Sequence, residues 1–132
     1  MILAILACTT EPVDSGTTLA PTLVNVQSEV FTASCAFSTC HGDGGGNAGL
    51  SLLDGVSYSE LVGILAEGDL ETGAPPEGAT RVVPGDPDAS YLVQKLQGES
   101  TIVGDPMPSD AGLDADRLAL VREWIATGAE DN

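Results

Sequence analysis

The residues best suited to chemistry in this sequence are two cysteines and a histidine in the segment FTASCAFSTCHGDGGG, which begins at Phe31. Four residues separate Cys35 from Cys40, and His41, the only histidine of the chain, follows directly. Two thiols beside an imidazole could attach a haem covalently, close a small disulfide loop, or supply part of a zinc site. Haem attachment sites usually have two residues between the cysteines, so a haem here would require a longer bridge.

A second candidate ligand lies much further along the chain. Met107 is the only methionine after the initiator, and its surroundings, GESTIVGDPMPSDAG, show no helical periodicity. This position disfavours the usual role of methionine as flexible core filler. Imidazole on one side of a haem iron and thioether on the other is a ligand set of electron-transfer proteins, and the methionine tends to raise the potential. Lys95, water or an empty position are the alternatives to Met107.

Other kinds of site receive less support. A zinc site would need a fourth ligand, and the chain has no second histidine and no second closely spaced cysteine pair. The DGGGN segment at 43–47 lacks the spaced oxygens and closing glutamate of an EF-hand, and no phosphate-loop lysine follows it. The sole histidine leaves no Ser/His/Asp set, and nothing singles out one pair among the 20 carboxylates.

Four segments with apolar residues at helical spacing predict a small all-α domain that could position these groups. The first stripe leads into the cysteines and consists of Leu23, Val26, Val30, Ala33 and Phe37. The second begins at Ser57-Tyr58-Ser59-Glu60, which has capping-box spacing, and continues through Leu61, Val62 and Leu65. Residues 80–83 could form a short extended piece.

The third and fourth predicted helices have clear boundary signals. Asp86 and Pro87 suit the N-cap and first position of the third helix, and Gly98 suits its end. The third stripe is Ala89, Leu92, Val93 and Leu96, and the fourth, after Asp114 and before Gly128, is Leu118, Val121 and Ile125 with Leu120 and Trp124 beside it. The long glycine-rich connections between these helices need something to organise them.

Composition limits the protein class. A chain of 132 residues fits one domain, since domains commonly contain about 100–150 residues. With 16 glycines and only five aromatic residues, the core is thin, and a large buried prosthetic group would fill it. The net charge of −16 disfavours nucleic acid and anionic membrane surfaces as partners. It favours a basic protein partner or a salty environment, although solubility alone would also explain it.

The N-terminal run MILAILAC ends in a small residue followed by Cys8, which is typical of the end of a bacterial lipoprotein signal. No Lys or Arg precedes Cys8, and a start codon assigned too far downstream would explain this. The run is too short to span a bilayer, which takes about 20 residues. We expect a partial signal at 1–8 with Cys8 lipidated, a flexible tether at 9–22 and the domain at 23–132. The alternative is a frayed apolar terminus with a free thiol.

Five segments of the chain together resemble a small monohaem cytochrome c of the class I type, in a bacterial lipoprotein or secreted variant. These segments are VFTASCAFSTCHG, GLSLL, RVVPGDPDASYLVQKL, DPMP and LDADRLALVREWIATGA. The resemblance covers most of residues 23–130 and departs from the family in its C-x4-C-H spacing, which also occurs in some multihaem cytochromes. It implies about four helices with long loops around one haem.

The resemblance also implies roles for individual residues. Cys35 and Cys40 would attach haem c, and His41 and Met107 would be the axial ligands of its iron. Leu50 and Leu52 would form the apolar turn that follows the attachment site, and Phe31 and Trp124 would mark the contact of the first and last helices. Arg81 is the basic residue expected nearest a haem propionate, with a solvated loop arginine as the alternative.

The sequence therefore predicts an electron carrier or relay domain, not an enzyme, anchored by lipid in the bacterial cell envelope on the periplasmic face or outer membrane. Its partner would be a redox protein with a basic docking face, and no small-molecule substrate is indicated. Two alternatives stay open. One is a non-redox binding or surface module closed by a Cys35–Cys40 disulfide, and the other is a haem sensor whose sixth position is open.

Overall fold

The computed structural model describes residues 18–43 and 47–132, and Cys8 with the predicted signal lies outside these ranges. In the described part the structure is mostly helical and has no sheet, which confirms the all-α prediction at that level. The elements in chain order are α1 (Leu23–Val26), a π-helical segment η1 (Gln27–Phe31), α2 (Thr32–Ser34), a 3-10 turn η2 (Asn47–Gly49), α3 (Ser57–Leu61), α4 (Tyr91–Gln97) and α5 (Ala115–Ala126).

The first helical run, α1 through α2, changes its winding in the middle. It begins at Thr22, whose hydroxyl accepts a hydrogen bond from the Asn25 amide at 3.3 Å. A π turn holds more residues than an α turn, so η1 shifts the face of every later side chain. Val30 is buried as predicted, and Phe31 joins it in the core. The predicted stripe is wrong beyond this point, because Ala33 and Phe37 are exposed.

The second helix is shorter than the stripe suggests. The capping-box prediction is wrong: the Ser57 hydroxyl is buried and donates to Gln27 Oε1 at 2.6 Å instead of capping α3. The chain becomes extended at Val62, so Leu65 leaves the predicted stripe and is 61% exposed. Residues 62–65 run beside 80–82 through isolated bridges, which confirms the predicted extended piece.

The third helix begins later than predicted, at Tyr91. Asp86 accepts a hydrogen bond from the Ala89 amide at 3.1 Å, and the Ser90 hydroxyl donates to the Asp86 carbonyl at 2.8 Å. These bonds form a turn before α4 rather than its first turn. Its end is confirmed, since Gly98 adopts the left-handed conformation with φ 63°.

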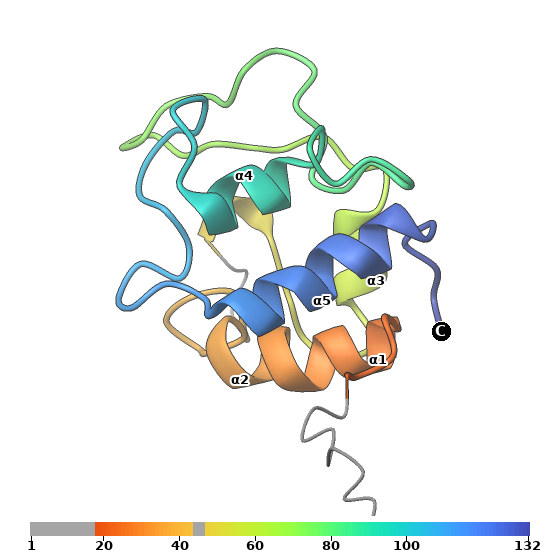
Figure 1. The fold of residues 1–132 in the computed structure, drawn as a ribbon. Helices are drawn as coiled ribbons and strands as arrows, with labels where there is room; N and C mark the ends of the chain where they lie inside the picture. Colours follow the sequence, from red (N-terminus) through yellow and green to blue (C-terminus); the bar gives the residue numbers. More distant parts are fainter. Residues whose placement is uncertain (1–17, 44–46) are drawn as a thin grey trace, which may run out of the picture.

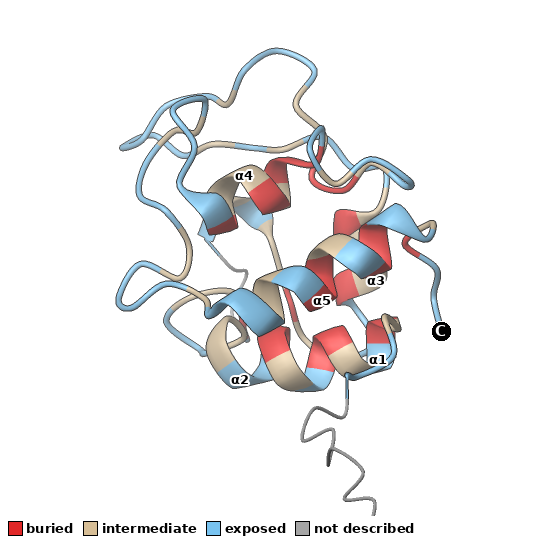
Figure 2. Ribbon diagram, in the orientation of Figure 1, coloured by how far each residue is buried: buried red, intermediate tan, exposed pale blue. Residues whose placement is uncertain are grey.

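The last helix starts as predicted and closes the core. Asp114 caps α5 by accepting from the Arg117 amide at 2.9 Å. Helix α5 packs against α1 and α4 (Figure 1), and the buried residues gather where the helices face one another (Figure 2). Phe31 and Trp124 are both fully buried and belong to the same apolar cluster, with Val26, Val30, Leu52, Leu61, Val82, Val93, Val121 and Ile125 among its other members.

Two further features complete the fold. The C-terminal residue Asn132 accepts hydrogen bonds from the amides of Leu23 and Val24, each at 3.0 Å, and so joins the chain end to the start of α1. Among the described residues, no helix is long and apolar enough to cross a membrane.

Candidate cofactor site

A cavity of about 640 Å³ lies between the segment that follows α2, helix α4 and the loop after α4. This volume falls in the range of about 300–1,000 Å³ typical of small-molecule and cofactor sites. The cavity brings together every site residue predicted from the sequence within the described ranges, namely Cys35, Cys40, His41, Leu50, Leu52, Arg81 and Met107. Lys95, the alternative ligand, also lines it.

His41 is held by both its backbone and its ring. Its amide donates to the Cys35 carbonyl at 3.1 Å, and its carbonyl accepts from the Leu52 amide at 2.8 Å. Its Nδ1 lies 3.1 Å from the Leu50 carbonyl oxygen. Because a carbonyl can only accept, this bond assigns the proton to Nδ1 and leaves the Nε2 lone pair for a metal, as is usual for metal-binding histidines.

The electrostatics of His41 also suit a ligand. Burial is the main cause that lowers the pKa of the imidazole below its usual 6.5, and the hydrogen bond to Leu50 acts in the opposite direction. The nearby positive charges of Arg81 and Lys95 lower the pKa further. The neutral ring, which is the form that binds metals, is therefore favoured at neutral pH.

The two cysteines are partly buried free thiols. Burial, with a smaller contribution from Cys40, raises the pKa of the Cys35 thiol to about 11. Cys35 is consequently protonated at neutral pH and reacts slowly by itself with thiol reagents, because the thiolate is the nucleophile.

Gly42 does not line the cavity but shapes the turn after His41, and no role was predicted for it from the sequence. The chain turns back tightly after His41, and the Gly42 amide donates to the Phe37 carbonyl at 2.9 Å. A Cβ at position 42 would lie 2.6 Å from the Ala36 carbonyl oxygen and 2.7 Å from that of Phe37. Only glycine fits here. Its position directly after the histidine is the sequence feature from which this role could have been predicted.

Met107 lies in the loop between α4 and α5 and is partly buried. Its amide donates to the Lys95 carbonyl at 2.9 Å. The Lys95 ammonium donates to the carbonyls of Val103 and Asp105, the latter at 2.9 Å. The Val103 amide in turn donates to the Tyr91 hydroxyl at 3.0 Å, so α4 holds this loop at several points.

Arg81 differs from the expectation of a solvated loop residue. It is only 6% exposed, because its guanidinium donates to three backbone carbonyls. These belong to Glu60 at 2.8 Å, Ala48 at 3.1 Å and Gly49 at 3.3 Å, and the Glu60 carboxylate lies 3.6 Å away. Arg81 thus connects the segment before Leu50 to helix α3. The predicted contact with a haem propionate stays a prediction.

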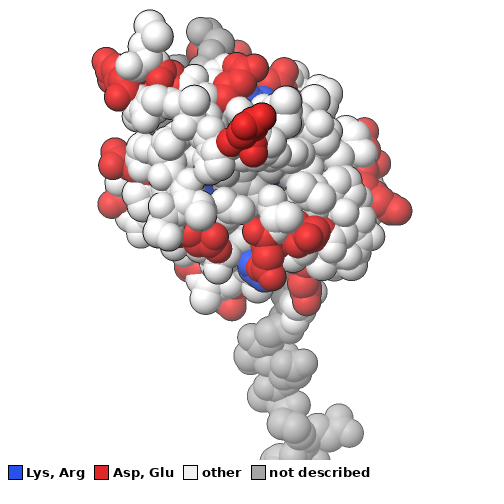
Figure 3. Space-filling view, turned by 90° about the horizontal axis from the view of Figure 1, so that it is seen from above, with Lys and Arg blue, Asp and Glu red and all other residues white. Residues whose placement is uncertain are grey.

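The mouth of the cavity is acidic. Five of the lining residues are carboxylates, namely Glu67, Asp69, Glu71, Asp105 and Asp110. Asp69 organises its own turn, accepting from the Glu71 amide at 2.8 Å and the Thr72 amide at 2.7 Å, and these bonds, those from Thr72 first, lower the pKa of the Asp69 carboxyl. Figure 3 shows several separate groups of acidic side chains on the face seen from above, and few basic ones. The sequence analysis had assigned no role to residues 66–72.

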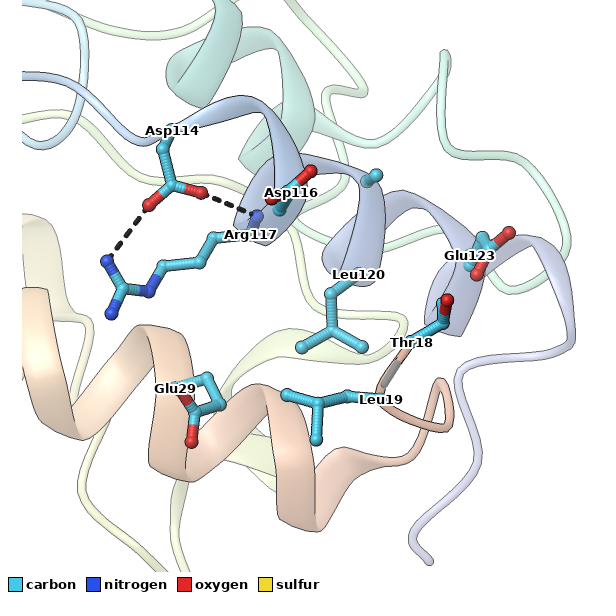
Figure 4. Close-up of a pocket in the computed structure, with 9 residues that line it drawn as sticks. Thr18, Leu19, Glu29, Asp114, Asp116, Arg117, Leu120 and Glu123 are labelled. Carbon is cyan, nitrogen blue, oxygen red and sulfur yellow. Dashed lines mark hydrogen bonds and ion pairs between the residues drawn. The ribbon is translucent and has the colours of Figure 1, made fainter. Parts of the chain in front are cut away.

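A second hollow, of about 590 Å³, lies where α5 begins beside the first helical run (Figure 4). Among its described lining residues there is no thiol and no imidazole, and the one cation, Arg117, is paired with Asp114 at 2.9 Å. The thiols, the imidazole and the thioether of the described residues thus lie at the first cavity.

Comparisons of this chain with family models, with curated proteins and with solved structures find no match. The function is therefore inferred from the residues of the cavity.

Proposed function

We propose that this protein is an electron carrier or relay domain that holds one c-type haem in the cavity. The observation that carries the proposal is the convergence of two thiols, the only histidine and the only internal methionine on one cavity, although Met107 is distant from the others in sequence. The hydrogen bond from His41 Nδ1 to the Leu50 carbonyl is further support, because it presents Nε2 as a ligand.

Different residues of the cavity would attach the haem, bind its iron and shield its ring. Cys35 and Cys40 would hold the haem through thioether bonds, each formed by addition of the S–H group across one vinyl group, which would consume no oxidant or reductant. His41 Nε2 and the Met107 sulfur would be the protein ligands of the iron. When bound, the haem supplies one-electron redox chemistry, and its potential depends on these ligands and on burial. Leu52, which is almost fully buried, and Leu50, which packs against the same apolar cluster, would keep water from the ring.

We further propose a basic redox protein as partner and the bacterial cell envelope as location, with lipid on Cys8. The partner proposal is supported by the net charge of −16 and by the carboxylates at the cavity mouth. Electron exchange with a basic donor should slow as salt rises, because steering is screened over about 8–10 Å. A rate that ignores ionic strength would contradict this partner. The location depends on the sequence pattern around Cys8, which lies outside the described residues.

Intact mass provides the direct test of haem attachment. The chain is produced in the periplasm of a bacterium with a working cytochrome c maturation system and denatured before measurement. We expect one added haem, absent from a Cys35→Ser, Cys40→Ser variant, and a reduced-minus-oxidised spectrum of a c-type cytochrome. An unmodified mass from a host that loads a control cytochrome would reject the proposal and favour the disulfide-closed module.

A further inference from the structure

The four basic residues of the chain are used in two ways. Arg117 and Arg122 pair with carboxylates at the surface, Asp114 and Asp88 respectively. Arg81 and Lys95 line the cavity and donate mainly to backbone carbonyls. In a protein with 20 carboxylates, two cations directed at carbonyls need a separate explanation.

Lys95 contacts the loop of Met107 at three points. Its ammonium donates to the carbonyls of Val103 and Asp105, and its own carbonyl accepts from the Met107 amide at 2.9 Å. The loop also approaches Lys95 closely at Gly104, where a Cβ would lie 3.6 Å from the ammonium nitrogen and 3.0 Å from the Thr72 methyl carbon. Residues 103–107 therefore close around one side chain of α4.

The same contacts argue against Lys95 as an iron ligand. An amine binds a metal through its lone pair and therefore in its neutral form, whereas the Val103 and Asp105 carbonyls are acceptors that stabilise the charged ammonium and hold it at the loop. Burial lowers the pKa of Lys95 below its usual 10.5, and the charges of Asp105 and Asp69 oppose this shift only in part. Charged hydrogen bonds of this kind are roughly twice as strong as neutral ones.

We propose that Lys95 is a positioning residue that fixes the loop 103–107 and thereby sets Met107 against the cavity. A thioether has no donor, so its side chain cannot be oriented by a hydrogen bond of the kind that holds the His41 ring. The loop backbone must position the Met107 side chain instead, and Lys95 is the residue of α4 that makes the most hydrogen bonds to residues 103–107. The link to an iron ligand depends on the proposed function, whereas the fixing of the loop does not.

The first test compares haem-loaded variants. Lys95→Met keeps the length of the side chain and removes the donor, Lys95→Arg keeps a cation, and Arg117→Met is the matched control at a surface pair. In Lys95→Met we expect the sulfur-to-iron charge-transfer band to weaken, the potential to fall, and the affinity of the ferric protein for added imidazole to rise about tenfold or more. Lys95→Arg should restore most of the band, and the control should match wild type.

The second test does not require iron. Amide hydrogen exchange is measured on the full chain as purified, and the Met107 amide should exchange about tenfold faster or more in Lys95→Met than in wild type. Exchange in α5 should be unchanged, which separates loop release from general unfolding. If Lys95→Met does not fold, Lys95→Gln, which retains one amide donor group, replaces it.

The outcomes distinguish the two proposals. Unchanged Met107 exchange in folded Lys95→Met, or in Lys95→Gln where it replaces that variant, would overturn the positioning role, whatever the haem content. Faster exchange in a chain that carries no haem would support the fixed loop while rejecting the electron-transfer proposal. Faster exchange with an unchanged band, potential and imidazole affinity would overturn the link between Lys95 and the iron.

Discussion

The two sides of the cavity are built differently. On the His41 side, the side chain itself is hydrogen-bonded, and the turn around it is closed by short-range backbone bonds from His41 to Cys35 and from Gly42 to Phe37. On the Met107 side, the loop backbone makes the bonds, to the ammonium and backbone carbonyl of Lys95 and to the Tyr91 hydroxyl, all from α4. The difference follows from chemistry, because imidazole has a donor of its own and a thioether has none. We therefore expect a rigid first ligand and an exchangeable second one.

The largest effect is expected at His41. His41→Ala removes the only imidazole, and the fraction of chains carrying a correctly ligated haem should fall to about a tenth or less, since even loss of an outer-shell partner commonly costs about 10–100-fold in metal affinity. The measurement is the haem content by mass together with the low-spin spectrum. A normal spectrum in His41→Ala would show that His41 is not an iron ligand, and the comparison of the His41 and Met107 sides as two ligand positions would no longer hold.

Replacement of Met107 should have a smaller effect, confined to the iron. Met107→Ala should keep the haem but lose the sulfur-to-iron band, lower the potential and open the iron to carbon monoxide or cyanide, since a sulfur ligand favours the ferrous state. Met107→His should close the site again at a lower potential. An unaltered spectrum and potential in Met107→Ala would make the methionine a bystander, and the haem-sensor alternative would then be preferred.

Gly42 tests the rigidity of the His41 side. In Gly42→Ala the new methyl would meet two backbone carbonyls, so we expect a loss of about 2–3 kcal/mol in the free energy of unfolding. Gly112→Ala is the matched control: it has open space but φ 71°, and should cost about 1 kcal/mol. Urea denaturation of both variants gives the difference. Equal losses would show that the turn after His41 yields more readily than the close contacts imply.

The smallest effect is expected at Asp114, where the Met107 loop ends and α5 begins. Hydrogen bonds from the Arg117 amide and the charge of Arg117 hold the pKa of this carboxyl below its usual range. Because the pKa is lower in the folded state, this stabilisation is present above the ordinary value and is lost as the pH falls through the folded one. Asp114→Ala should therefore lower the melting temperature at neutral pH and have less effect at about pH 2. A loss of the same size at both pH values would mean that the charge of Asp114 is not what stabilises the start of α5.

Local signals made part of this fold predictable. Gly98 ends α4 and Asp114 begins α5 where the sequence places them, because a left-handed glycine and a capping carboxylate act within one turn. The Cys35, Cys40 and His41 group was likewise visible because its members are adjacent in the chain. Met107 was identified by its uniqueness, and the structure brings it to the same cavity.

The features that could not be predicted depend on distant partners. Ser57 has the spacing of a cap, but its hydroxyl bonds to Gln27, which no local pattern reveals. Arg81 reads as a loop residue, and its burial depends on carbonyls from two other segments. The role of Lys95 is also non-local, since it arises only when the loop folds back over α4.

The π-helical segment η1 has a consequence for how this sequence can vary. A π turn within an α-helical run corresponds to one inserted residue, and an α-helix turns about 100° per residue. Deletion of one residue between 27 and 31 would therefore rotate everything that precedes the segment against everything that follows it. Cys35 and His41 could not then face the cavity while Val26 stayed in the core. Evolutionary change in this helix should proceed by substitution, with its length held constant between the core residue Val26 and the first cysteine.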